Sequence, residues 1–118
     1  MESDSRHEMT VEELAQKLKT SGKFIVLDVR EAWEVDEARL NDARVEVRPM
    51  SQLATGGLDA LPASARSPDA EIYVLCQHGV RSANVTSWLA ALGWIKIFSV
   101  SGGLDEYARK VDRSIGRY

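Results

Sequence analysis

A short segment of the chain combines a nucleophile with groups that bind anions. Cys76 directly follows the apolar run 72–75, and Gly79 and Arg81 come soon after it. A thiolate is the nucleophilic form of cysteine, and nearby cations and helix N-terminal amides favour it over the thiol. Gly79 permits backbone angles at which successive N–H groups turn inward, and the Arg81 guanidinium presents a fork of donors that suits an oxyanion. The segment therefore predicts a nucleophilic thiolate on an anion-binding loop.

Other interpretations of the same residues need to be weighed. A lone cysteine after an apolar strand is by default a small buried hydrophobe, and it is Gly79 and Arg81 that favour the nucleophile instead. His78 is interpreted as a residue of the loop rim, because an ionised thiol needs no general base. Cys76 is the single cysteine of the chain, which excludes a disulfide within the chain. With only two histidines, there is no second cluster of ligands that could complete a metal site with Cys76 and His78. We therefore expect no metal site and no cofactor.

The elements around this loop follow from apolar patterning. The runs at 24–29 and 72–75 have no polar alternation, which is typical of strands buried on both faces of a parallel sheet. Thr10 and Glu13 form a capping-box pattern that predicts a helix ending near Gly22. Further expected elements are helices over 31–40, 82–92 and 104–111, strands over 44–48 and 95–100, and a short helix with loops over 51–70. In the helix over 82–92, the apolar face is predicted to include Val85, Trp88, Leu89 and Leu92.

The alternation of strands and helices predicts an α/β fold, a largely parallel central sheet flanked by helices on both faces. Ligands in such sheets bind beyond the carboxyl ends of the strands. Three segments fall at expected strand ends: 28–30, the loop from Cys76, and 101–103. We therefore expect the functional site where these segments meet.

Composition limits the classes of function. The 118 residues include 44% hydrophobic and 28% charged residues, which suits one domain over 1–118, with 1–8 expected as a flexible polar tail. The net charge of −3 gives no bulk attraction to nucleic acid or to an anionic membrane. No apolar stretch approaches the about 20 residues of a membrane span, and the N-terminus lacks an apolar signal core. The expectation is a cytoplasmic protein that can function as a monomer.

The loop and two further motifs resemble one known family. Residues 76–82, Cys-Gln-His-Gly-Val-Arg-Ser, are similar to the active-site loop of single-domain rhodaneses. Residues 27–31, Leu-Asp-Val-Arg-Glu, resemble the family's early strand-end motif, and residues 100–104, Val-Ser-Gly-Gly-Leu, its late glycine pair. The three motifs stand in the family's order and cover most of the chain from Phe24 onward.

This resemblance implies a rhodanese fold and a two-step sulfur transfer. The Cys76 thiolate takes the outer sulfur of thiosulfate or a persulfide, and a thiol or protein acceptor then removes it. The resemblance implies that backbone N–H groups of the loop stabilise the persulfide and that Arg81 binds the sulfonate end of the donor. It places Asp28 and Arg30 beneath the loop as a structural ion pair. The active-site loop residues that it implies are Cys76, Gln77, His78, Gly79, Val80, Arg81 and Ser82.

The sequence departs from the family pattern in one turn. Residues 39–43, Arg-Leu-Asn-Asp-Ala, stand where relatives carry a His-Ile-Pro-Gly-Ala type turn, so this turn must be built differently. In the last helix, Tyr107 stands near the place of a common tryptophan.

Two other functions are compatible with parts of the pattern. A cysteine phosphatase or arsenate reductase uses a similar loop, but with five residues between cysteine and arginine, whereas Cys76 and Arg81 enclose four. A phosphate needs the wider ring, and a single sulfur does not. A rhodanese-like module that only binds or senses a partner is the non-enzymatic alternative. Such modules usually lose the cysteine, which this chain keeps.

Overall fold

The chain folds around a five-stranded sheet in the computed structural model, which describes residues 7–116. The strand order is β1-β5-β4-β2-β3, and every neighbouring pair is parallel. The strands are β1 (Glu8–Met9), β2 (Ile25–Asp28), β3 (Val45–Val47), β4 (Ile72–Leu75) and β5 (Ile97–Val100). The expected α/β class and parallel sheet are confirmed. Because β4 lies in the centre, Cys76 emerges between β2 and β5.

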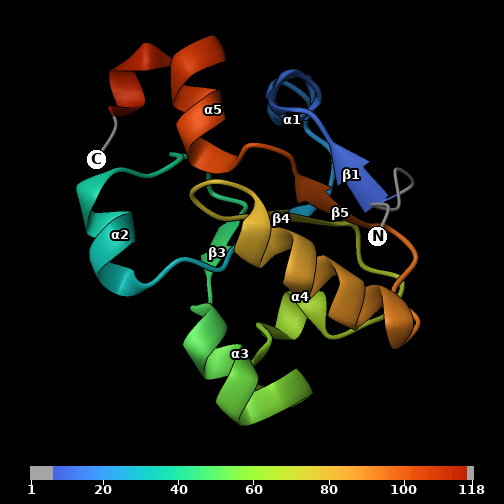
Figure 1. Cartoon of the computed structure of the whole chain (residues 1–118). Coiled ribbons are helices and arrows are strands. Elements are labelled where there is room, and N and C mark those ends of the chain that lie inside the picture. The colour runs from blue at the N-terminus through green and yellow to red at the C-terminus, as the bar shows by residue number, and fades with distance from the viewer. Residues whose placement is uncertain (1–6, 117–118) are drawn as a thin grey trace.

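Helices cover both faces of the sheet (Figure 1). The α-helices are α1 (Val11–Leu18), α2 (Ala32–Glu37), α3 (Met50–Gly56), α4 (Val80–Ala91) and α5 (Gly103–Lys110), and short 3₁₀ turns occupy Gly57–Ala60, Ala63–Ala65 and Arg113–Ile115. In Figure 1, α1 and α5 lie above the sheet, α3 and α4 lie below it, and α2 lies at one side. Within 7–116 no helix is both long and apolar enough to cross a membrane.

The uninterrupted apolar run of β4 is explained by its position. All four of its residues are buried. Tyr73 and Leu75 pack into the core shared with α1 and α5, whereas Ile72 and Val74 pack into the core shared with α4. Side chains alternate between the faces of a strand, so Cys76 continues the second set and points toward the α3 and α4 side of the sheet.

Several predicted boundaries move in the structure. The Thr10 and Glu13 capping box is present, with Glu13 N–H donating to Thr10 Oγ1 at 3.0 Å. Helix α4 begins at Val80 rather than at 82, because Gly79 with φ 97° turns the chain into the helix. The prediction that Leu92 lies on the apolar face is wrong. Leu92 is 50% exposed, and Trp94 occupies the core at this end of the helix.

The expected flexible tail at 1–8 is wrong for its last two residues. Glu8 forms β1 with Met9 and pairs with Ser99 of β5. His7 Nδ1 lies 2.8 Å from the carbonyl oxygen of Ile97. A two-residue strand has no alternation pattern that a sequence could show, so the pairing could not be predicted. Residues 1–6 of the expected tail lie outside the described residues.

Arg44 organises the atypical turn that precedes β3. Its guanidinium pairs with both carboxylate oxygens of Asp42, at 2.9 and 3.0 Å. It also donates to the carbonyl oxygens of Leu18, Thr20 and Gly22 at the end of α1, and its Cζ lies 4.2 Å from the centre of the Phe24 ring. This chain therefore closes its 39–43 turn through a charged side chain, without the proline and glycine of the family pattern.

Candidate active site

The loop after β4 surrounds the sulfur of Cys76 with hydrogen-bond donors. The backbone N–H groups of Gly79 and Ser82 point to Sγ, at 3.1 and 3.3 Å. Cys76 is only 1% exposed. The left-handed backbone at Gly79 brings these two amides to the same atom, and a Cβ there would stand 3.0 Å from the Gly102 nitrogen. Two donors on a buried sulfur form a site for a negatively charged sulfur atom.

A buried hydroxyl pair lies behind the cysteine. The thiol donates to Ser82 Oγ at 3.4 Å, and Ser82 Oγ lies 2.8 Å from Ser99 Oγ. Ser82 also donates to the Gly79 carbonyl oxygen at 3.2 Å. Ser99 belongs to β5 and was not singled out in the sequence, because its role depends on β5 lying next to β4. One turn along α4, the buried Thr86 hydroxyl has no hydrogen-bond partner among the described residues.

The late glycine pair supports the loop from below. The N–H groups of Leu104 and Asp105, at the start of α5, donate to the carbonyl oxygens of Cys76 and Gln77 at 2.9 and 3.0 Å. Gly103 lies so close to these peptides that its position tolerates no Cβ. The amino end of α5 is therefore used to hold the backbone of the cysteine loop.

Asp28 and Arg30 form a buried ion pair under the loop. Both are 0% exposed, and Arg30 Nη2 lies 2.8 Å from Asp28 Oδ2. Arg30 Nη1 also donates to the carbonyl oxygens of Glu34 and Ala38 and lies 3.5 Å from Gln77 Oε1. Arg30 thus connects β2, α2 and the loop, and it has a structural position rather than one exposed to a substrate.

Arg81 is bound to a carboxylate of α2. Its two terminal nitrogens donate to the two oxygens of Glu34, at 2.6 and 2.7 Å. The Glu34 side chain is 7% exposed and that of Arg81 33%. The sequence pattern predicted that Arg81 binds an anion at the loop. It gave no prediction for Glu34, which lies in a charged segment without a distinguishing pattern. The pairing needs α2 and the loop to meet in space.

Two loop residues, His78 and Val80, point outward, whereas Gln77 is buried beside Arg30. Val80 is 70% exposed, and the imidazole of His78 is 68% exposed with Nδ1 4.0 Å from Asp105 Oδ2. This position agrees with a rim residue. Between residues 7 and 116, no group of three or more His, Cys, Asp and Glu side chains is arranged to hold a metal ion.

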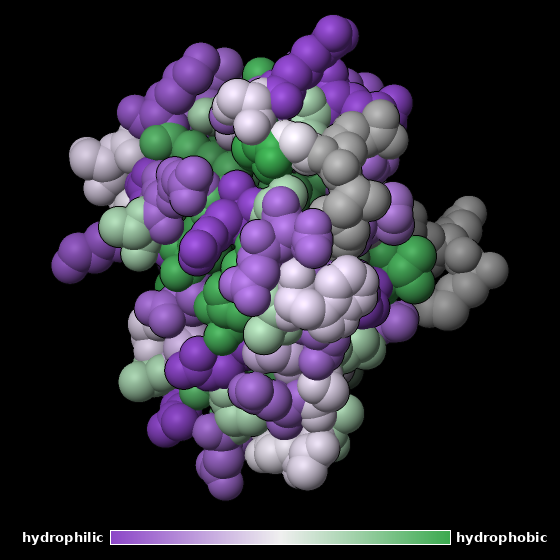
Figure 2. All heavy atoms as spheres, turned by 90° about the vertical axis from the view of Figure 1, so that its left-hand side faces the viewer, coloured by the Kyte–Doolittle hydropathy of each residue, from purple (hydrophilic) through white to green (hydrophobic). Residues whose placement is uncertain are grey.

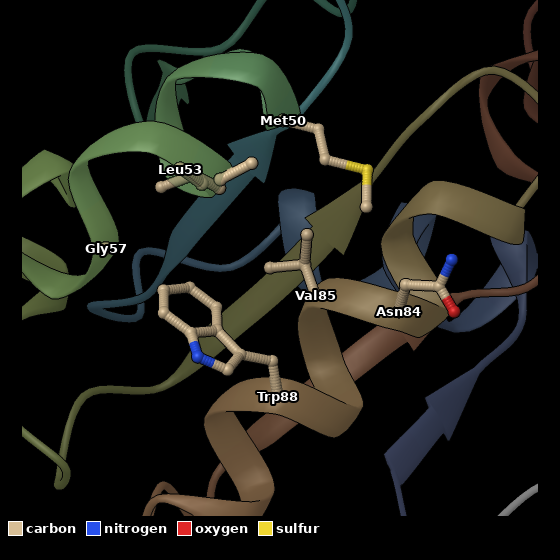
Figure 3. A pocket seen from close by; sticks show the side chains of 7 residues that line it. Met50, Leu53, Gly57, Asn84, Val85 and Trp88 are labelled. Atoms are coloured by element: carbon tan, nitrogen blue, oxygen red, sulfur yellow. The ribbon is translucent and has the colours of Figure 1, made fainter.

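An apolar pocket of about 320 Å³ lies between α3 and α4 (Figure 3). It begins one helical turn beyond Arg81, and none of its lining residues belongs to the cysteine loop. The lining residues are Met50, Leu53, Ala54, Gly57, Asn84, Val85 and Trp88. None of these side chains titrates or acts as a nucleophile, so the pocket supplies no chemistry of its own.

Comparison with known proteins agrees with this geometry. The family model described as Rhodanese-like domain matches residues 10–110. The chain belongs to the rhodanese-like domain family. A chloroplastic rhodanese-like/PpiC domain-containing protein 12 of Arabidopsis thaliana is 33% identical over 114 residues, which is 94% of this chain and 37% of that protein. The thiosulfate sulfurtransferase GlpE of Haemophilus influenzae is 44% identical over 41 residues, 35% of this chain and 39% of GlpE.

A solved structure shows the same fold. The rhodanese-related protein of Thermoplasma volcanium is 28% identical and superposes with a TM-score of 0.71 over 89% of this chain and 93% of the other. The matched region covers less than half of each curated relative named above, 37% of the Arabidopsis protein and 39% of GlpE. Of these relatives, GlpE is itself named a thiosulfate sulfurtransferase.

Proposed function

We propose that this chain is a sulfurtransferase that carries a sulfane sulfur as a persulfide on Cys76. The donor is thiosulfate or another persulfide, and the acceptor is a thiol or a protein. The observation that carries the proposal is the pair of backbone N–H groups, from Gly79 and Ser82, aimed at the buried Sγ. These donors stabilise the Cys76 thiolate before the transfer and the persulfide anion that forms when the donor is thiosulfate.

The loading step is a nucleophilic displacement at sulfur that needs no external oxidant or reductant. With thiosulfate, the Cys76 thiolate attacks the sulfane sulfur, the bond to the sulfonate sulfur breaks, and sulfite leaves with the electron pair. With a protonated persulfide R–S–SH, the thiolate attacks the outer sulfur and R–S⁻ leaves, so that the proton stays on the new cysteine persulfide. In the second step an acceptor thiolate attacks the outer sulfur of the Cys76 persulfide, and the Cys76 thiolate leaves.

A cellular compartment that keeps thiols reduced suits this chemistry. Cys76 is the single cysteine and must be free to react. Reducing conditions prevail in the cytosol, and a cytoplasmic location is therefore part of the proposal.

Intact-mass spectrometry tests the proposal directly. After incubation with thiosulfate or with a small persulfide, the protein should gain the mass of one sulfur atom, and a thiol or cyanide should remove it. Cys76→Ser keeps the size of the side chain and serves as the control, which should gain no sulfur. A wild-type protein that gains no sulfur from either donor would instead support a module that only binds a partner.

A further inference from the structure

The cation of the cysteine loop is already engaged. Both oxygens of Glu34 accept from the Arg81 guanidinium at 2.6 and 2.7 Å, which is the fork-to-fork geometry of a strong ion pair. Glu34 is itself held in place: its side chain accepts from the Glu31 N–H at 2.8 Å, and its carbonyl oxygen accepts from Arg30. A donor that needs the Arg81 charge must compete with this buried carboxylate.

The other described charges near Cys76 do not compensate for this engagement. Asp28 and Arg30 neutralise each other and are fully buried. Asp105 lies on the loop side of α5, within 4.0 Å of His78. Arg48 follows β3, two strands from β4, and its guanidinium donates to the carbonyl oxygen of Val47 at 2.8 Å. With Cys76 ionised, the thiolate, Glu34 and Arg81 together carry one negative charge.

The two classes of donor differ in the charge that they bring to this site. Thiosulfate carries two negative charges, and the sulfite that leaves also carries two. A simple organic persulfide carries at most one charge on its sulfur atoms. Like charges in a partly buried site repel each other strongly, so the neutralised loop opposes thiosulfate more than a persulfide. The side that carries α2 and the β4–α4 loop is rich in hydrophilic residues (Figure 2), but hydrophilicity alone supplies no positive charge.

We infer that Glu34 is a specificity-determining residue, which neutralises Arg81 and so makes persulfides better donors than thiosulfate. The inference rests on the proposed function, because it concerns the donor that loads Cys76. Glu34 acts through Arg81, and we assign it no contact with the reacting sulfur atoms.

A charge-removing variant tests the inference. Glu34→Gln keeps an oxygen that can accept from the Glu31 N–H but removes the negative charge that faces Arg81. The measurement is the rate constant of sulfur loading, followed by intact mass in a single turnover, with thiosulfate and with the persulfide of 2-mercaptoethanol. The ratio of the thiosulfate to the persulfide rate constant should rise about tenfold in this variant. Glu37→Gln removes the same charge from an exposed position of α2 and should leave the ratio unchanged.

A double variant separates charge from structure. In Glu34→Gln with Arg81→Gln both charges of the pair are gone, so the ratio should return toward the wild-type value. If Glu34 only held α2 in place, Glu34→Gln would lower both rate constants alike and leave the ratio unchanged, which would overturn the inference.

The wild-type protein offers a test without substitution. Thiosulfate and the site both carry negative charge. The rate of sulfur loading from thiosulfate should therefore increase as the salt concentration rises from about 0.02 to 0.5 M, because salt screens the repulsion. If the positive charge of Arg81 attracted thiosulfate, this loading rate would instead fall as the salt concentration rises. A fall would overturn the inference but not the proposed sulfur loading itself. Loading by neither donor would overturn the proposed function and the inference with it.

Discussion

Gly103 lies against the carbonyl group of Cys76. A Cβ at position 103 would stand 2.4 Å from the Cys76 carbonyl oxygen and 2.6 Å from the carbonyl carbon of Gln77. The next residue, Leu104, donates its N–H to the same Cys76 oxygen at 2.9 Å. The late glycine pair therefore determines how closely α5 can approach the nucleophile, although neither glycine carries a functional group.

Gly103→Ala should displace the loop and impair sulfur loading. The left-handed backbone with φ 63° costs about 1–2 kcal/mol for a residue with a Cβ, and the contact with Cys76 adds to this. We expect a lower free energy of unfolding in urea and at least a tenfold slower gain of sulfur by intact mass. Gly57→Ala is the control: its φ is 61°, and nothing lies within 4 Å of the added Cβ. It should load at the wild-type rate, and equal loading by both variants would contradict the prediction.

The sequence predicted the parts of the site that are local in the chain. The strand before Cys76, the left-handed Gly79 and the helix after it follow from a continuous segment, and residues 28–30 and 101–103 could be assigned to strand ends by their place after apolar runs. Glu34 and Ser99 could not be found in this way. Each acquires its role by touching the loop from another element, and neither stands in a distinctive pattern. The 39–43 turn was recognised as unusual, but the contacts of Arg44 with the end of α1 join residues more than 20 positions apart.

Ser99→Ala should weaken the support behind the nucleophile. It removes the hydroxyl 2.8 Å from Ser82 Oγ in a buried site, which should lower the free energy of unfolding by about 1 kcal/mol. We also expect severalfold slower sulfur loading, because Ser82 lies directly against Sγ.

Thr86→Val is a matched control for that experiment. It also removes a buried hydroxyl, one turn of α4 beyond Ser82, but this hydroxyl makes no hydrogen bond among the described residues. A nearly isosteric apolar replacement should then be neutral or stabilising. If urea titration showed the same loss for both variants, the Ser82 and Ser99 contact would contribute nothing specific.

The Asp42 and Arg44 pair should make stability depend on acid pH. The hydrogen bond from Arg44 holds the pKa of Asp42 below its ordinary value of 3.8. Folding therefore favours the ionised carboxylate, and this contribution is present above the ordinary pKa and disappears as pH falls through the lower pKa of the folded state. Urea titrations of wild type and Asp42→Asn should differ at neutral pH and converge toward strongly acid pH.

Asp36→Asn is the control for this pH dependence, because Asp36 is exposed on α2. It leaves the Asp42 and Arg44 pair intact and should keep the wild-type free energy of unfolding at neutral pH. A constant difference between wild type and Asp42→Asn across the whole range would show that the turn does not depend on the ionised pair.

The size of the cysteine loop should determine whether the protein takes up sulfur or hydrolyses a phosphate ester. Four residues separate Cys76 from Arg81, and the amides of Gly79 and Ser82 converge on one sulfur atom. Inserting one glycine after Gly79 would shift Ser82 along α4 and separate the two amides. Since a hydrogen bond to a charged group is worth about 1.5–3 kcal/mol, losing both should slow sulfur loading at least about 100-fold.

The same insertion after Gly57, in the α3 region away from the loop, controls for the added length and should keep wild-type loading. Each protein is assayed in parallel for gain of sulfur by intact mass and for hydrolysis of an aryl phosphate. The wild type should load sulfur and leave the phosphate intact, because a ring closed on one atom has no room for a tetrahedral group with four oxygens. Efficient phosphate hydrolysis by a wild type that takes up no sulfur would replace the sulfurtransferase proposal by a cysteine phosphatase.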